Sequence, residues 1–388
     1  MTAFYPSAMH SDTVPPRNAG IDALRGLSIL LVVLHHLALR IPLRSSALAD
    51  HVPRRVLNAL SYNGYEAVFV FFVISGFLIA RHAMLRWGSL AGIDLPAFYA
   101  RRARRILPTL LLLLLVLSLL HLAGVANFVI DRPDQSLSRA LLAALGLHLN
   151  WYEGATGYLP GNWDVLWSLS IEETFYLAFP LLCLCVRSRG LLGVLLLALV
   201  AAIPFSLMAI VDNEIWKEKA YLPGMGAIAA GVLAALAERC WPRLPQAVVR
   251  GIGGFGALGL LTLMLAMREL WPLLHDFVVF WLVVCAASLV FALAQSRARP
   301  LPGLGWLRSM GRLSYEIYLG HMFVVFAITA AFKASGGDLR SGWLWYLPAV
   351  ILSWALGALV SRCYAEPLGR ALTRRLGGRA PRPLQRLA

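Results

Sequence analysis

Residues 22–36 read DALRGLSILLVVLHH and place one arginine and two histidines inside the first long apolar segment of the chain. Each residue of an α-helix turns by about 100°, so the step from Arg25 to His36 amounts to about 20° after three full turns. Arg25 and His36 therefore share one face, about 16 Å apart along the helix axis. His35 points about 100° away from His36. We expect the chemistry of the protein to lie along the Arg25–His36 face.

The composition excludes a soluble globular domain. Of the 388 residues, 59% are hydrophobic and only 14% are charged, which is typical of a polytopic membrane protein. The 35 basic residues exceed the 20 acidic ones, but they lie in short clusters between apolar segments, a pattern of membrane topology rather than of nucleic-acid binding. The five cysteines lack metal-ligand spacing, so we expect neither a disulfide framework nor a metal site.

Ten apolar segments are long enough to cross a bilayer as helices. They cover about residues 23–41, 64–80, 106–123, 166–186, 190–211, 221–238, 250–268, 274–295, 312–333 and 343–365. An eleventh patch at 138–150 is too short to cross and is expected to be interfacial or re-entrant. Pro367 is expected to end the last helix. The predicted fold class is an all-α polytopic membrane bundle of about ten transmembrane helices.

The distribution of charge predicts the topology. With ten crossings, most arginines fall in the loops of one side, and most acidic loop residues fall on the other. Loops rich in Lys and Arg stay in the cytoplasm, so both termini are predicted to be cytoplasmic. We expect a polar N-terminal segment at 1–20, a membrane domain at 21–370 and a basic cytoplasmic tail at 371–388.

Four arginines, Arg101, Arg102, Arg104 and Arg105, lie at the start of the third predicted span. Such a cluster commonly faces anionic lipid headgroups. Alternatively, it binds a phosphorylated donor, because guanidinium groups pair bidentately with phosphate oxygens. The residues by themselves are consistent with both interpretations.

Acidic residues and histidines also occur inside the predicted spans, where charged groups are costly and face a cavity or a partner. The fourth span contains adjacent Glu172 and Glu173, and at most one of them is expected to face a site because neighbours on a helix diverge by about 100°. The ninth span contains His321. These groups and His36 indicate a polar active cavity. Ser75, followed by a glycine, indicates close helix packing, with a hydroxyl in the site as the alternative.

The longest predicted loop, about 124–165, is rich in aromatic residues and glycine, and Trp163 and Trp167 lie at its end. Aromatic rings beside small residues can form a stacking surface for carbohydrate. Membrane-interface belts use the same residue types, so the aromatic residues alone do not distinguish the two roles.

Taken together in this order, the motifs resemble those of the acyltransferase-3 family of integral membrane O-acyltransferases. The matching segments are 25–36, 71–77, 98–108, 167–176, 314–321 and 366–367, which span nearly the whole chain. The resemblance implies a ten-helix protein of a bacterial cytoplasmic (inner) membrane. It also implies transfer of an acyl group, usually acetyl from acetyl-CoA, to hydroxyls of cell-surface or exported carbohydrates or of small secreted molecules.

Acyl transfer to an alcohol needs a base near the hydroxyl and a group that stabilises charge on the carbonyl oxygen. We expect His36 to be the general base, with the alternative that it carries the acyl group itself. Glu172 is expected to orient or stabilise an imidazole, and His321 to complete the catalytic set. The phosphates of acyl-CoA, a co-substrate and not a resident cofactor, are expected at Arg25, Arg101, Arg102, Arg104 and Arg105. Substrate contacts are expected from Ser75, Glu173, Tyr315, Tyr318, Trp163 and Trp167.

A second hypothesis is a transporter or flippase for a lipid-linked glycan, in which the buried His, Arg and Glu side chains would gate or relay protons. The sequence has no internal repeat of the kind that such transporters carry. Under either hypothesis the expected partners are a carbohydrate or exported small molecule and membrane lipid, and no nucleic acid.

Overall fold

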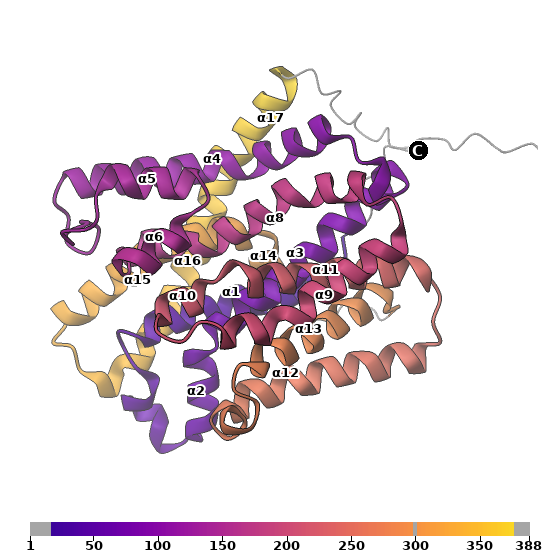
Figure 1. Ribbon diagram of the computed structural model, residues 1–388. Coiled ribbons are helices and arrows are strands. Elements are labelled where there is room, and N and C mark those ends of the chain that lie inside the picture. Colours follow the sequence, from indigo (N-terminus) through magenta and orange to yellow (C-terminus); the bar gives the residue numbers. More distant parts are fainter. Residues whose placement is uncertain (1–16, 298–300, 376–388) are drawn as a thin grey trace, which may run out of the picture.

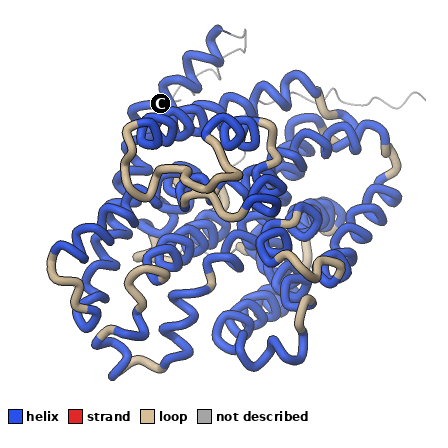
Figure 2. Tube along the Cα trace, turned by 60° about the vertical axis from the view of Figure 1, so that its left-hand side comes forward, coloured by secondary structure: helices blue, strands red, loops and turns tan. Residues whose placement is uncertain are grey.

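The computed structural model describes residues 17–297 and 301–375, and every regular element in these ranges is helical (Figure 2). Ten segments of this part are long and apolar enough to cross a membrane, as predicted. The α-helices are α1 (Ala19–Ala38), α2 (Arg54–Tyr62), α3 (Gly64–Trp87), α4 (Leu95–Leu122), α5 (Leu137–Leu145), α6 (Leu149–Thr156), α7 (Gly161–Asp164), α8 (Leu166–Cys185), α9 (Arg189–Met208), α10 (Glu214–Lys219), α11 (Tyr221–Cys240), α12 (Gln246–Leu274), α13 (Phe277–Gln295), α14 (Gly305–Arg312), α15 (Ser314–Ala334), α16 (Tyr346–Val360) and α17 (Glu366–Arg375).

The apolar patch at 138–150 does not cross. It divides between α5 and α6, which have only nine and eight residues. Ser136 begins α5 by accepting a hydrogen bond from the backbone N–H of Arg139, and Leu147, with a φ of 59°, separates the two helices. Helices of this length reach less than halfway across a hydrocarbon core, which leaves the count at the predicted ten.

The third span begins earlier than hydropathy indicates. Asp94 accepts a hydrogen bond from the backbone N–H of Ala97, and α4 starts at Leu95 and not near residue 106. Arginine and alanine are good helix formers, so the helix continues through the charged segment that an apolar window excludes. The arginine cluster therefore lies within α4, and its members take fixed directions around the helix.

The last span ends later than predicted. A π-helical turn, Ser361–Ala365, follows α16, and α17 then continues through Pro367. Pro367 is the second residue of α17, where a missing N–H costs little, so the proline does not stop the chain from being helical. Residues 376–388, most of the predicted basic tail, and residues 1–16 of the predicted N-terminal segment lie outside the described residues.

Helices α1 and α3 occupy the middle of the bundle, with α4 and α8 on one side and α12 and α13 on the other (Figure 1). Their contacts depend on glycine. A Cβ on Gly76 of α3 would clash with the backbone carbonyl of Ile228 in α11, and one on Gly231 would clash with the carbonyl of Val73. The helix backbones thus touch directly, as the sequence predicts for small residues in a membrane bundle.

A buried ionic cluster joins α6, α7 and α10. The side chains of Lys219 and Glu153 are fully buried, and the Lys219 ammonium donates to a Glu153 carboxylate oxygen at 2.6 Å and also to Asp164. Burial and the nearby Asp164 raise the pKa of Glu153, an effect that Lys219 opposes. The cluster closes the bundle at the end where α1 and α4 terminate, called here the loop end. The end where α1 and α4 begin is called the arginine end.

Candidate active site

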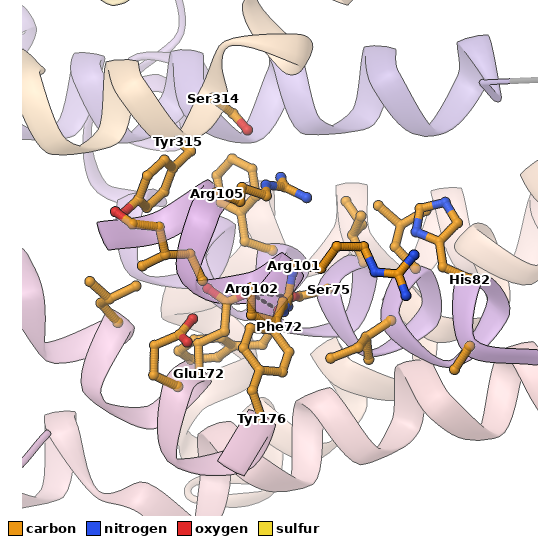
Figure 3. Close-up of a pocket in the computed structure, with 18 of the residues that line it drawn as sticks. Phe72, Ser75, His82, Arg101, Arg102, Arg105, Glu172, Tyr176, Ser314 and Tyr315 are labelled. Atoms are coloured by element: carbon orange, nitrogen blue, oxygen red, sulfur yellow. Dashed lines mark hydrogen bonds between the residues drawn. The ribbon is translucent and has the colours of Figure 1, made fainter. Parts of the chain in front are cut away.

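A cavity of about 940 Å³, called here the arginine cavity, lies between α3, α4 and α8 and reaches α1 and α15 (Figure 3). The structure brings together in its walls many side chains that the sequence singles out. Predicted site residues that line the cavity are Arg25, Ser75, Arg101, Arg102, Arg105, Glu172, Glu173, Tyr315 and Tyr318.

The arginines of this cavity have aromatic and hydroxyl partners. Arg25 donates to the Ser314 hydroxyl at 2.7 Å, and the Arg102 guanidinium lies 3.4 Å from the centre of the Tyr176 ring. No ion pair within the described ranges joins Arg25, Arg101 or Arg102 to a carboxylate, and buried nitrogens of Arg101 and Arg102 have no hydrogen-bond partner there. A buried cation is stable when an anion accompanies it, so the cavity suits a polyanionic ligand.

Arg104 differs from the other arginines of the cluster, because it does not line the cavity. Measured from Arg101, residues 102 and 105 lie about 100° and 40° around α4 on one side, whereas residue 104 lies about 60° away on the other. The Arg104 backbone instead lies beside Gly369 of α17. The helical arc explains why three of these four arginines face the cavity together.

Glu172 lies in a cluster of hydroxyl groups. One of its carboxylate oxygens accepts hydrogen bonds from Ser75 and from Tyr176, and the two hydroxyls also contact each other. Figure 3 shows this cluster next to Arg102. None of the hydrogen bonds recorded for Glu172 in the described part of the chain involves an imidazole, so the geometry does not support the expectation that Glu172 orients a histidine.

The position of Glu173 differs from what we expected from the sequence. Both adjacent carboxylates line the arginine cavity, although we expected at most one of them to face a site. The cavity is wide enough to cover the roughly 100° of the α8 surface that separates the two side chains. One oxygen of Glu173 is buried without a hydrogen-bond partner in the described residues, which is consistent with a ligand or water contact there.

The two histidines form a pair. His36 and His321 lie on α1 and α15, with His321 Nε2 at 3.3 Å from His36 Nδ1. His36 Nδ1 is also 2.9 Å from the Val32 carbonyl, and His321 Nδ1 is 2.7 Å from the Tyr318 carbonyl. Carbonyl oxygens only accept, so both Nδ1 atoms carry the proton and His321 Nε2 is the acceptor for His36. No hydrogen bond of the described residues involves His36 Nε2, so this nitrogen is available as a base.

His35 points elsewhere, as the helical arithmetic predicts. Its Nδ1 lies 3.1 Å from the Ser61 carbonyl, and its ring covers Gly64 at the start of α3. Arg25 and His36, by contrast, both meet α15, where their partners are Ser314 and His321. The prediction of a shared Arg25–His36 face is confirmed.

Tyr318 separates the histidine pair from the arginine cavity. It lines the cavity, and its ring centre lies 5.9 Å from that of His321, whereas neither His36 nor His321 belongs to the lining. The Tyr318 hydroxyl accepts from Ser168 at 2.8 Å and donates to the Val165 carbonyl at 2.9 Å. The Tyr318–Ser168 contact joins α15 to α8 and is called here the partition, because Tyr318 lies between the arginine cavity and the histidine pair.

Trp163 and Trp167 do not form an open surface on which a carbohydrate could stack, one of the two roles that the sequence left open. Trp163 is fully buried and its indole N–H has no partner in the described residues, while Trp167 is 6% exposed and packs against Tyr65. Neither lines the arginine cavity. Aromatic composition alone does not distinguish a surface for sugars from a packed helix interface.

Further residues of the cavity were missed by the sequence reasoning. His82 and Arg86 of α3 and Tyr176 and Ser168 of α8 line it. The helical period offers a signal for His82, because it follows Ser75 by seven residues and therefore returns to nearly the same face. Tyr176 follows Glu172 by four residues for the same reason.

Comparisons with known proteins identify the family of the chain. A sequence model of the acyltransferase domain matches residues 18–362. The O-acetyltransferase OatA of Staphylococcus aureus strain NCTC 8325 is 25% identical over 343 residues, covering 79% of this chain and 50% of OatA. A provisionally named O-acetyltransferase of strain COL is 23% identical over 337 residues with the same coverage. The chain spans about half the length of these relatives, and no solved structure matches it. By the extent of the domain match, the chain belongs to the acyltransferase-3 family.

Proposed function

We propose that this protein transfers an acyl group, acetyl from acetyl-CoA, to a hydroxyl of a cell-surface or exported carbohydrate. The observation that carries the proposal is the alignment on α1 of two side chains, Arg25 and His36. Within the described residues, Arg25 lines the arginine cavity without a carboxylate partner, and His36 Nε2 makes no hydrogen bond. The family membership and the names of the relatives support acyl transfer to a hydroxyl. The donor and the carbohydrate acceptor belong to the proposal.

The proposed topology places the arginine end in the cytoplasm of a bacterium and the loop end outside its cytoplasmic membrane. The excess of basic residues in the loops of the arginine end supports this orientation. Acyl-CoA then enters the arginine cavity from the cytoplasm, where its phosphates pair with Arg25, Arg101, Arg102 and Arg105. The flexible arm of the donor runs along α1 toward His36, about 16 Å beyond Arg25.

In the proposed reaction, His36 Nε2 accepts the proton of the acceptor hydroxyl. The hydroxyl oxygen forms a bond to the thioester carbonyl carbon, and the carbon–sulfur bond then breaks. The proton passes from His36 to the departing thiolate, which leaves as free CoA. His321 Nε2 accepts a hydrogen bond from the Nδ1–H of His36. This bond keeps the proton on Nδ1, so that His36 Nε2 stays basic and directed to the substrate.

The partition imposes one requirement on this reaction. Because Tyr318 lies between the arginine cavity and the histidine pair, the Tyr318–Ser168 contact has to open for the thioester to reach His36. Rotation of one tyrosine side chain is sufficient to break this contact. We infer that donor binding is coupled to movement of Tyr318.

The proposal is tested with the purified protein, labelled acetyl-CoA and a panel of carbohydrate acceptors. Acceptor-dependent release of CoA is expected in the wild type. His36→Ala should lower it by about 10²- to 10⁴-fold, the usual contribution of a general base. The matched control is His35→Ala, which removes a neighbouring imidazole directed at Ser61 and should retain most of the activity.

Two results would contradict the proposal. Undiminished product from correctly inserted His36→Ala protein excludes His36 as the base. Movement of a lipid-linked glycan across vesicles without CoA release identifies a transporter instead of an acyltransferase.

A further inference from the structure

A second cavity lies at the loop end, about 510 Å³ in volume and more open than the first. It is called here the loop cavity. The chain from 126 to 135 and the segment from 158 to 161 form most of its walls, and Arg40 and Phe326 complete them. Neither the proposed donor contacts nor the histidine pair includes a residue of this lining.

The loop cavity adjoins the histidine pair. Arg40 follows His36 by four residues, one turn further along the chain, and its guanidinium donates to the His36 carbonyl at 2.8 Å. Gly161 of the lining lies against the side chain of Met322, the residue after His321. Along α1 and its extension, His36 therefore lies between Arg25 of the arginine cavity and Arg40 of the loop cavity.

Arg40 brings a positive charge without an ion-pair partner in the described residues to the loop cavity. Its guanidinium lies 4.7 Å from the centre of the Phe326 ring, and none of the ion pairs of the described ranges includes it. Burial lowers the pKa of Arg40, as expected for a cation without a counter-charge. Asp131 also lines the cavity but is solvent-exposed and forms no ion pair with Arg40 in the described part. An anion in the cavity would supply the missing partner.

The remaining polar groups suit sugar hydroxyls. Gln135 lines the cavity, and its side-chain nitrogen donates to the Gly157 carbonyl at 2.7 Å. Asn127, held at a φ of 69°, also lines the cavity. Amide, carboxylate and guanidinium groups around a small open cavity are the partners that carbohydrate hydroxyls and acidic substituents need.

We propose that the loop cavity binds the acceptor and selects a sugar that carries an anionic group, with Arg40 pairing with that group. Its place in the reaction rests on the proposed acyl transfer, because the acceptor hydroxyl would then reach His36 from the side opposite to the donor. The binding itself does not depend on catalysis. Arg40 is accordingly a specificity-determining residue and not a catalytic one.

The test compares two probes that differ in one group, methyl β-D-glucuronide and methyl β-D-glucoside. The full chain is placed in lipid nanodiscs, and the dissociation constant of each probe is measured by saturation-transfer NMR titration. The wild type is expected to bind the glucuronide about tenfold or more tightly than the glucoside, the effect of one charge-assisted pair. Arg40→Gln should abolish this preference, and Arg40→Lys should retain part of it.

Arg44→Gln is the matched control, because Arg44 is an exposed arginine on the same connection and does not line the loop cavity. It should leave the preference unchanged. Equal binding of the two probes by the wild type, or a preserved preference in Arg40→Gln, overturns the proposal. If Arg40→Gln does not fold, an unchanged preference in Arg40→Met overturns it.

Failure of this proposal is distinguishable from failure of the proposed function. Absence of acceptor-dependent CoA release contradicts acyl transfer and leaves the glucuronide preference to be measured independently. Equal binding of the two probes together with CoA release contradicts only the selection of an anionic acceptor.

Discussion

Replacing Arg102 by methionine should weaken recognition of the donor's phosphates with little change to the packing of the cavity. Methionine keeps an apolar stem against the Tyr176 ring, from whose centre the Arg102 guanidinium lies 3.4 Å, but it removes the charge. Arg102 forms no ion pair with a carboxylate in the described residues, so its removal breaks none. A hydrogen bond to a charged group contributes about 1.5–3 kcal/mol, which corresponds to a loss of about 10- to 100-fold in kcat/KM for acetyl-CoA.

The assay measures kcat/KM for acetyl-CoA and for S-acetylpantetheine, which has the same thioester and no phosphates. Arg102→Met should reduce the preference for acetyl-CoA while the value for S-acetylpantetheine stays near that of the wild type. Arg104→Met is the matched control, since Arg104 belongs to the same cluster and does not line the cavity. Equal losses for both donors, or equal effects of the two substitutions, would refute the assignment of Arg102 to phosphate.

Two further predictions concern positioning and packing. His321→Leu should lower kcat by roughly 10²-fold with little change in KM for acetyl-CoA, because His36 loses the acceptor for its Nδ1–H hydrogen bond. Since the His321 side chain is fully buried, an apolar replacement should be tolerated. Steady-state kinetics measure the effect, and a change in KM alone would contradict the prediction. Gly76→Ala should sharply reduce the yield of monodisperse protein in size-exclusion chromatography, because the added Cβ would clash with the Ile228 carbonyl. In the control variant Gly254→Ala, the added Cβ meets no atom within 4 Å and should be tolerated. Equal yields of the two variants would show that the α3–α11 contact is not critical.

The number of spans and the face of α1 could be predicted from sequence because each depends on a local period. Hydropathy over about 20 residues identifies a crossing, and the 100° step puts Arg25 and His36 together against α15. The predicted start of the third span and the predicted end of the last span were wrong. Hydropathy does not detect that α4 continues through the arginines or that α17 continues past a proline in its first turn.

The partners of individual side chains depend on neighbours far along the chain, and the sequence does not reveal them. Nothing in the segment around Glu172 shows that its neighbours are Ser75 and Tyr176 and not an imidazole. The arginine cavity is lined by residues of α3, α4 and α8, so the inclusion of Glu173 depends on how these helices pack together. The same limitation applies to Trp163, which is buried although the aromatic composition of its segment also suited a sugar-binding surface.

The Tyr318–Ser168 partition has a consequence for the membrane itself. The arginine cavity and the loop cavity lie toward opposite ends of the bundle, and a continuous opening between them would lead across the bilayer. Such a passage would conduct protons and other ions and dissipate the potential across the membrane. With Tyr318 bonded to Ser168 and to the Val165 carbonyl, the two cavities remain separate. In the proposed reaction, the tyrosine that moves to let an acyl group pass would therefore also prevent an ion leak between turnovers.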